Sequence, residues 1–138
     1  MAESINIAKF FTKKNEEEGV PHELYIGGEK TGIVAYVYGV NSNAVTLANE
    51  TYRKEMAEIN GIKDPLMKSK KTDAAFAKRV AAFVKKFEGV DGQPLVIDGA
   101  PVTENDYSKI IDQSPLIARA ILEYASDTEG FLDSQKND

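Results

Sequence analysis

The stretch AAFAKRVAAFVKKF, residues 74–87, carries the strongest pattern in the chain and decides the predicted fold. Its large apolar residues recur at the i, i+4, i+7, i+8 and i+11 positions of one helical face: Phe76, Val80, Phe83, Val84 and Phe87. The alanines between them favour helix, and the basic side chains fall on the opposite face. The pattern therefore predicts a central helix that Thr72 caps and Gly89 ends, with the other elements packed on its phenylalanine face.

The strand pattern lies upstream of this helix. Residues 23–26 and 33–40 are rich in β-branched and aromatic side chains, and the segment between them, 27–32, is rich in glycine. These segments predict a β-hairpin with a loop of about four to six residues. Because the second strand is apolar on both sides, we expect both of its faces to be covered by helices or by another subunit.

Other helical patterns flank the hairpin and the central helix. Residues 4–17 read as a helix with Ile7, Phe10 and Phe11 on one face, and Glu16 to Glu18 as its solvated end. Asn43 or its neighbours cap a helix over 44–59, and 62–71 read as an exposed, mobile linker. Residues 95–97 read as a short strand.

Two helix-start signals follow near the end of the chain. Thr103 to Asp106 form a capping box, and Ser114-Pro115 pairs a cap with a proline at the first helical position. The inner face of the last helix is predicted to include Leu116, Ile117, Ala120, Ile121 and Tyr124. The fold class is thus α+β: a mostly helical single domain of four to five helices with one N-terminal β-hairpin, over residues 1–132. Residues 133–138 are predicted to be a flexible C-terminal tail.

Composition limits the function classes. The net charge of −5 argues against a general nucleic-acid binder. The chain has no cysteine, no apolar run of membrane-spanning length and no signal-peptide pattern, so we expect a cytoplasmic protein without a membrane partner. His22 is the only histidine and has no second ligand or nucleophile beside it, and no other motif carries recognisable catalytic chemistry. We expect no enzyme activity, no metal and no cofactor.

The charge is unevenly distributed. Residues 62–89 hold eight Lys or Arg against three Asp or Glu, whereas residues 98–138 hold three against nine. These segments are either two solvated faces of opposite sign, or the basic one meets an acidic surface on the same molecule, on a second copy or on a partner. The second alternative makes a homo-oligomer possible. The basic side chains, with one arginine of the preceding helix, are the candidate partner-binding residues: Arg53, Lys68, Lys70, Lys71, Lys78, Arg79, Lys85 and Lys86.

An ordered set of short motifs runs through residues 8–132. In chain order the motifs are Phe10-Phe11-Thr12, Glu18-Gly19-Val20, Glu23-Leu24-Tyr25, Gly39-Val40-Asn41-Ser42, Arg53, Phe87-Glu88-Gly89, Gly92-Gln93-Pro94-Leu95, Thr103-Glu104-Asn105, Pro115-Leu116-Ile117, Asp127 and Phe131. This order resembles the small tail assembly chaperones of tailed bacteriophages and prophages. Two positions depart from that pattern, since Asn41 stands at a usual Asp and Phe87 at a usual Trp.

The resemblance implies a non-enzymatic role in tail morphogenesis. Such proteins coat the long tape-measure protein while the tail tube polymerises around it, and they are absent from the finished virion. The implied partners are the tape-measure protein and the tail-tube protein, in the cytoplasm of a host bacterium. The alternatives are a structural tail-tube or head–tail connector subunit, and a small regulatory adaptor that binds a protein target.

Overall fold

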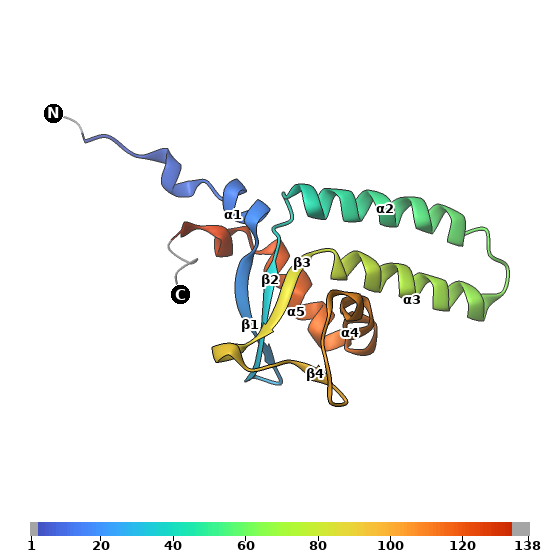
Figure 1. Cartoon of the computed structure of the whole chain (residues 1–138). Coiled ribbons are helices and arrows are strands. Elements are labelled where there is room, and N and C mark those ends of the chain that lie inside the picture. The colour runs from blue at the N-terminus through green and yellow to red at the C-terminus, as the bar shows by residue number, and fades with distance from the viewer. Residues whose placement is uncertain (1–2, 134–138) are drawn as a thin grey trace.

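A three-stranded antiparallel sheet, in the order β1-β2-β3, lies at the centre of the computed structural model, which describes residues 3–133 (Figure 1). Helix α5 crosses the sheet, and helices α2 and α3 form a long antiparallel pair that extends away from it. The elements are η1 (Ile7–Phe10), α1 (Lys13–Glu18), β1 (Val20–Ile26), β2 (Glu29–Val37), α2 (Asn43–Ile59), α3 (Pro65–Ala81), β3 (Val84–Gly89), η2 (Val90–Gly92), β4 (Val96–Ile97), β5 (Ala100–Pro101), η3 (Glu104–Asp106), α4 (Tyr107–Gln113), α5 (Pro115–Ser126) and η4 (Thr128–Phe131). The predicted class is confirmed in outline: a small α+β domain with five α-helices among the described residues.

The predicted hairpin is β1 paired with β2, but its loop is shorter than expected. Gly27 and Gly28 make a two-residue turn with φ of 65° and 80°. Only glycine adopts this conformation readily, and it matches the twist of the flanking strands. Residues 29–32, assigned to the loop from the sequence, belong to β2.

Strand β2 is covered fully on one face only. Ala35 and Val37 are inaccessible to solvent, whereas Val34 and Tyr36, which point to the other side, are half-buried. The inner residues join Leu24 in a core that α5 completes. Within the described residues, the face of β2 that carries Tyr36 is only half-covered, so of the two expected covers a helix is not complete there, and cover by another subunit stays a prediction.

The predicted central helix is two elements. Helix α3 begins at Pro65, with the Asp64 carboxylate accepting the Leu66 N–H, so the segment predicted as a linker is helical from residue 65 onward. It ends at Ala81, and the chain from Val84 to Gly89 pairs with β2 as β3. Thr72, predicted as a cap, lies inside α3 and donates its hydroxyl to the carbonyl of Lys68.

Gly89 ends no helix. Its backbone is extended, with φ of −83°. A Cβ at this position would overlap the Gln93 carbonyl, so a glycine is needed for close approach of two chain segments and not for a left-handed cap. The helical spacing of Phe76 to Phe87 is real, but pairing with β2 decides the conformation of its second half.

The predicted N-terminal helix is interrupted. Residues 7–10 form one 3-10 turn capped by Asn6, and α1 begins only at Lys13. Phe10 and Phe11, expected on a packed face, are exposed. Figure 1 shows this part of the chain leaving the body beside α1.

Glu16 is buried, contrary to the prediction that Glu16 to Glu18 form a solvated end. Its Oε1 accepts the backbone N–H and the side-chain amide of Asn41 at 3.1 and 3.0 Å, and its Oε2 accepts the Thr12 hydroxyl at 3.1 Å. Glu17 accepts the N–H of Asn43 at the start of α2. Helix α1 therefore holds the loop that leads from β2 into α2.

The remaining predicted helix starts agree with the structure. The Ser42 and Ser114 hydroxyls accept the N–H groups of Val45 and Ile117, and the capping box of Thr103 and Asp106 is present. The inner face of α5 is buried as predicted at its centre, but Leu116 is exposed. The strand predicted at 95–97 is the two-residue β4, which pairs with β5.

The end of the described chain is fixed. Phe131 is fully buried, and the Asn15 side-chain amide donates to both the Phe131 carbonyl and the Asp133 carboxylate. Asp133, the first residue of the predicted tail, thus accepts a hydrogen bond from α1, and residues 134–138 of that tail lie outside the described part. Within residues 3–133, none of the helices has the length and apolar content that crossing a membrane requires.

Candidate functional site

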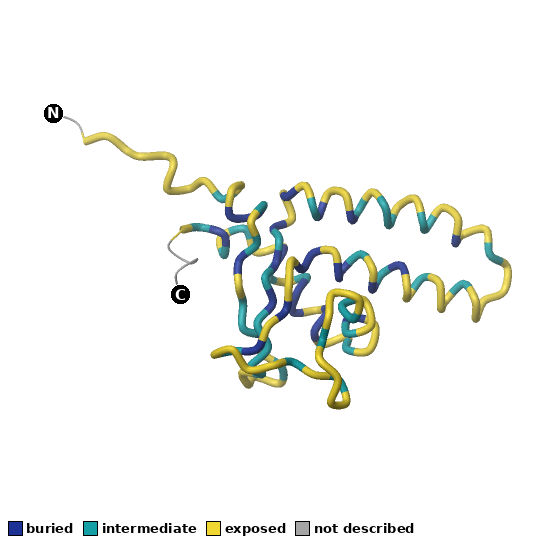
Figure 2. The backbone as a smooth tube through the Cα atoms, in the orientation of Figure 1, coloured by how far each residue is buried: buried dark blue, intermediate teal, exposed yellow. Residues whose placement is uncertain are grey.

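The helical hairpin α2–α3 is the most prominent feature of the surface. The two helices run side by side, and most of their residues furthest from the sheet are exposed (Figures 1 and 2). Among the exposed large apolar side chains on this hairpin are Leu47, Leu66 and Met67. An element that carries apolar side chains into solvent in this way is suited to contact with another protein.

Arg79 fixes the packing of the two helices near the sheet. Its Nε donates to the Asn49 side chain on α2 at 2.7 Å. Its guanidinium lies over the rings of Tyr52 and Phe83, at 5.2 and 5.4 Å from their centroids. These cation–π contacts place one charged side chain on apolar surface without isolating it from a polar partner. Arg79 is thus a structural residue as well as a rim residue of the groove beside it.

A groove of about 300 Å³ runs between the two helices at this point. Lys78 on its α3 rim forms an ion pair with Glu55 on the α2 rim at 2.9 Å. Leu47 is 68% exposed and provides its largest free apolar surface. The lining is mainly apolar, with polar groups at the rim: Ala44, Leu47, Ala48, Thr51, Tyr52, Glu55, Ala75, Lys78, Arg79 and Ala82.

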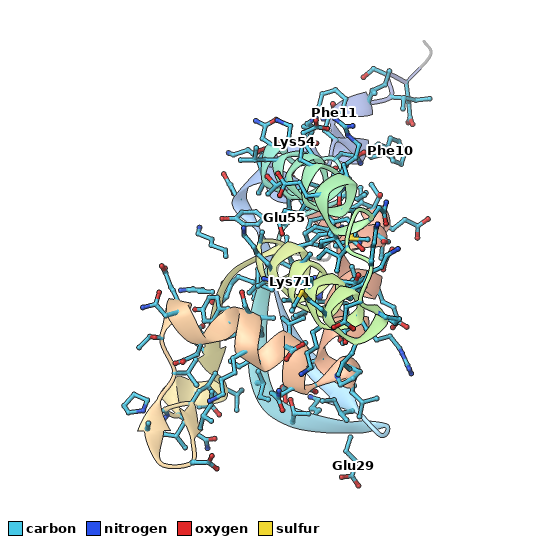
Figure 3. All side chains as sticks on the ribbon, turned by 90° about the vertical axis from the view of Figure 1, so that its right-hand side faces the viewer. Phe10, Phe11, Glu29, Lys54, Glu55 and Lys71 are labelled. Atoms are coloured by element: carbon cyan, nitrogen blue, oxygen red, sulfur yellow. The ribbon has the colours of Figure 1, made fainter. Side chains whose placement is uncertain are left out.

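The predicted partner-binding residues do not form one site. Six of the eight lie on the α2–α3 hairpin: Arg53, Lys68, Lys70, Lys71, Lys78 and Arg79. Only Lys78 and Arg79 line the groove. Arg53 pairs with Glu50 one helical turn away, and this contact lowers the pKa of the Glu50 carboxyl. Figure 3 looks along the hairpin and shows Glu55 and Lys71 on its two helices.

Lys85 and Lys86 lie on β3, away from the groove. The Lys86 ammonium sits 4.4 Å from the Tyr36 ring centroid and 3.4 Å from the Glu88 carboxylate. The Tyr36 hydroxyl donates to Glu88 at 2.7 Å, and this bond raises the pKa of Tyr36. These contacts describe a polar, half-exposed sheet face. Lys85 and Lys86 therefore do not contribute to the α2–α3 groove.

Sequence reasoning missed Leu47, the most exposed residue of the groove. In the sequence, one apolar stripe of the helix predicted over 44–59 consists of Val45, Ala48, Tyr52, Met56 and Ile59. Leu47 lies outside this stripe, and a single leucine in that position was the available signal.

A second groove, of about 720 Å³, lies between α3, α4 and α5, and no sequence pattern predicted it. Phe76, Ile111 and Leu122 are among its apolar lining residues. Its charged lining residues are Asp73, Asp112, Arg119 and Glu123, all of them exposed. In Figure 1, α4 and α5, which line this groove with α3, lie on the side of α3 that faces away from α2.

His22 packs as a core residue. Its ring stacks on Tyr124 with centroids 4.1 Å apart and meets the edge of Phe131. Its Nε2 is buried without a hydrogen-bond partner. Burial lowers the pKa of His22, and the nearby Asp127 partly offsets this. Within residues 3–133, His, Asp and Glu side chains do not gather in a group of three that could hold a metal ion.

We expect acidification to destabilise the domain through His22. Because the folded-state pKa lies below the ordinary value of 6.5, the unfolded chain binds the proton first as the pH falls through about 6.5, and stability decreases from there. Thermal unfolding at about pH 7.5 and pH 5.5 measures the effect, with His22→Phe as the control that retains the stacking area. The wild type should lose more melting temperature than the variant. Equal losses would remove His22 as the cause.

The chain matches no model of a known protein family, no curated protein and no solved structure. Inference about its function therefore depends on its motifs and on the two grooves described above.

Proposed function

We propose that the chain is a non-enzymatic tail assembly chaperone that binds the tape-measure protein during morphogenesis of a phage or prophage tail. The observation that carries the proposal is the apolar groove of the protruding α2–α3 hairpin, considered together with the ordered motifs through residues 8–132. The site of action that follows is the cytoplasm of the host bacterium. No catalytic residue, metal or cofactor enters the proposal.

The groove has the properties that an amphipathic helix requires. Its floor is apolar, and its rim offers Glu55 on one helix and Lys78 and Arg79 on the other. Helix-in-groove binding uses apolar anchors at i, i+3 or i+4 and i+7, with rim charges that set orientation. A tape-measure protein is a long helical chain that exposes such stripes and aggregates unless they are covered. Many copies of a small acidic protein, each covering one segment, would keep it in solution.

The fold favours the chaperone over the structural alternative. Tail-tube subunits are rich in sheet, whereas this chain has five α-helices and short strands among its described residues. A regulatory adaptor would use the same kind of groove, so gene order separates it from the chaperone. A chaperone gene should lie between the tail-tube gene and a very long tape-measure gene, and a different neighbourhood would count against the proposal.

The groove makes a direct prediction. Leu47→Glu places a charge in the centre of the apolar surface, and burying that charge against a helix should weaken binding of the neighbouring tape-measure protein about tenfold or more. Leu66→Glu is the matched control, because Leu66 is 65% exposed on the same hairpin but does not line the groove.

Co-expression provides the measurement. The soluble fraction of the tape-measure protein should fall with Leu47→Glu and stay at the wild-type level with Leu66→Glu. If the wild type does not raise that fraction, the proposed function fails. If both variants behave as wild type, the α2–α3 groove is not the binding surface.

A further inference from the structure

A second surface of the molecule lacks a partner in the structure. The segment of residues 5–11, here called the arm, exposes four large apolar side chains within seven residues: Ile5 by 77%, Ile7 by 66%, Phe10 by 60% and Phe11 by 66%. Figure 3 shows Phe10 and Phe11 on the N-terminal part of the ribbon, at the opposite end of the view from Glu29. Two phenylalanines and two isoleucines this close together form an apolar patch of the kind that marks an interaction site.

The arm has a helical sequence pattern but does not form a full helix in the structure. Ile7, Phe10 and Phe11 are spaced i, i+3 and i+4, as on one face of a helix, yet the chain forms only a single 3-10 turn there. Short amphipathic helices are marginal in water because their stability comes from packing of the apolar face. The helical spacing of these apolar residues has no packing partner within the domain, which indicates that the arm becomes a helix when it binds another surface.

The chemistry of the arm selects one of the two grooves. The arm carries one charged residue, Lys9, and no acidic residue, and Lys13 and Lys14 follow it in α1, where Lys14 lies 3.9 Å from the Glu18 carboxylate. The α2–α3 groove presents two cations and one carboxylate, and that carboxylate is already paired with Lys78. The α3–α4–α5 groove instead presents three carboxylates and one guanidinium, around an apolar floor. A basic apolar arm therefore complements the α3–α4–α5 groove and not the other.

We infer that the arm of one copy docks as a helix in the α3–α4–α5 groove of a second copy of this chain. The apolar face of the arm covers Phe76, Ile111 and Leu122, and its single lysine, Lys9, faces Asp112 and Glu123 at the rim. The groove, at about 720 Å³, is the larger of the two and is long enough to touch three helices.

The placement of the two surfaces favours a second copy over the arm's own groove. The arm leaves the body beside α1, on the α2 side of the molecule, whereas α4 and α5 lie beyond α3 (Figures 1 and 3). Because different surfaces of the two copies meet, the contact is heterologous. After one contact, one copy still has a free groove and the other a free arm, so association closes into a ring or continues as a filament. A chain of this kind would present its α2–α3 grooves in a row.

The test uses the full chain with three pairs of substitutions. Phe10→Ser with Phe11→Ser removes the apolar anchors of the arm. Asp112→Lys with Glu123→Lys reverses the charge of the groove rim. Leu66→Ser with Met67→Ser removes exposed apolar area from the hairpin and is the matched control. Sedimentation from about 1 µM to 1 mM, a range that brackets weak association, measures the mass of each.

The expected result is a wild-type mass that rises with concentration and an unchanged rise in the control. The arm variant and the rim variant should each raise the dissociation constant about tenfold or more and remain largely monomeric. An equimolar mixture of these two variants should form a dimer and nothing larger, since one intact arm meets one intact groove. That dimer also establishes that both variants are folded.

Three results would overturn the inference: a monomeric wild type at every concentration, association that survives in the arm or rim variant, or a mixture that stays monomeric. None of them bears on the proposed function, because the tape-measure protein is assigned to the groove on the other side of α3.

Discussion

Replacing Phe83 by alanine should lower the free energy of unfolding by about 3–5 kcal/mol, the usual range for truncating a buried phenylalanine. Phe83 is only 3% exposed and belongs to the core cluster that joins α3, the sheet and α5. It lies at the junction where α3 ends and β3 begins. Its N–H donates to the Val80 carbonyl, and its own carbonyl accepts the Tyr38 N–H at 2.9 Å. The backbone there is fixed, so the cavity left by the ring cannot easily collapse.

The same substitution should affect the α2–α3 hairpin. The Arg79 guanidinium lies over the Phe83 ring, and it also bonds Asn49 on α2. Without the ring, Arg79 loses one of the surfaces that hold it. Urea unfolding followed by circular dichroism measures the free energy, with Phe11→Ala, at an exposed phenylalanine, expected to change it by less than about 0.5 kcal/mol. A loss below about 1 kcal/mol for Phe83→Ala would contradict the packing described here.

The sequence predicts best where local chemistry decides the structure. The caps at Ser42 and Ser114, the capping box at Thr103 and the span of α2 depend on side chains next to the backbone groups that they satisfy. The hairpin follows from strand propensity and a glycine turn. These elements need no distant partner, which is why the fold class could be inferred in advance.

Prediction from the sequence fails where a segment distant in the chain determines the local secondary structure. Residues 84–87 continue a helical pattern, yet they pair with β2, some fifty positions earlier in the chain. Ala82, the residue after α3, still has a helical backbone conformation, and Val84 then enters the sheet, where β3 pairs with β2. Nothing within the stretch itself signals this change.

The sequence indicated some residues of the candidate site but not where the grooves lie on the surface. The basic residues of α3 were named as candidate partner-binding residues, and of these only Lys78 and Arg79 border the α2–α3 groove. Leu47 and the α3–α4–α5 groove depend on how helices pack, and a one-dimensional pattern does not contain that information.

Replacing Glu16 by alanine should destabilise the domain by about 1–3 kcal/mol, because it leaves the partly buried donors of Asn41 and Thr12 without their acceptor. Glu16 is 1% exposed, and its carboxylate accepts the N–H and the side-chain amide of Asn41. Its backbone carbonyl accepts the Gly39 N–H at 3.0 Å. Gly39 makes this approach possible, since a Cβ there would overlap the Glu16 side chain. The loop from β2 to α2 is thus built around one carboxylate.

Two further variants test the role of the Glu16 carboxylate, because they retain different numbers of its acceptor oxygens. Glu18→Ala, two residues away on an exposed face of α1, should change the free energy of unfolding by less than about 0.5 kcal/mol. Glu16→Gln retains the shape and one acceptor oxygen, so its loss should fall between the other two. Hydrogen exchange at the Asn41 amide reports on the mechanism: exchange should accelerate in Glu16→Ala well beyond the change in global stability, because that amide loses its acceptor. If it accelerates only as much as the core amides do, Glu16 fills space and does not hold the entry to α2.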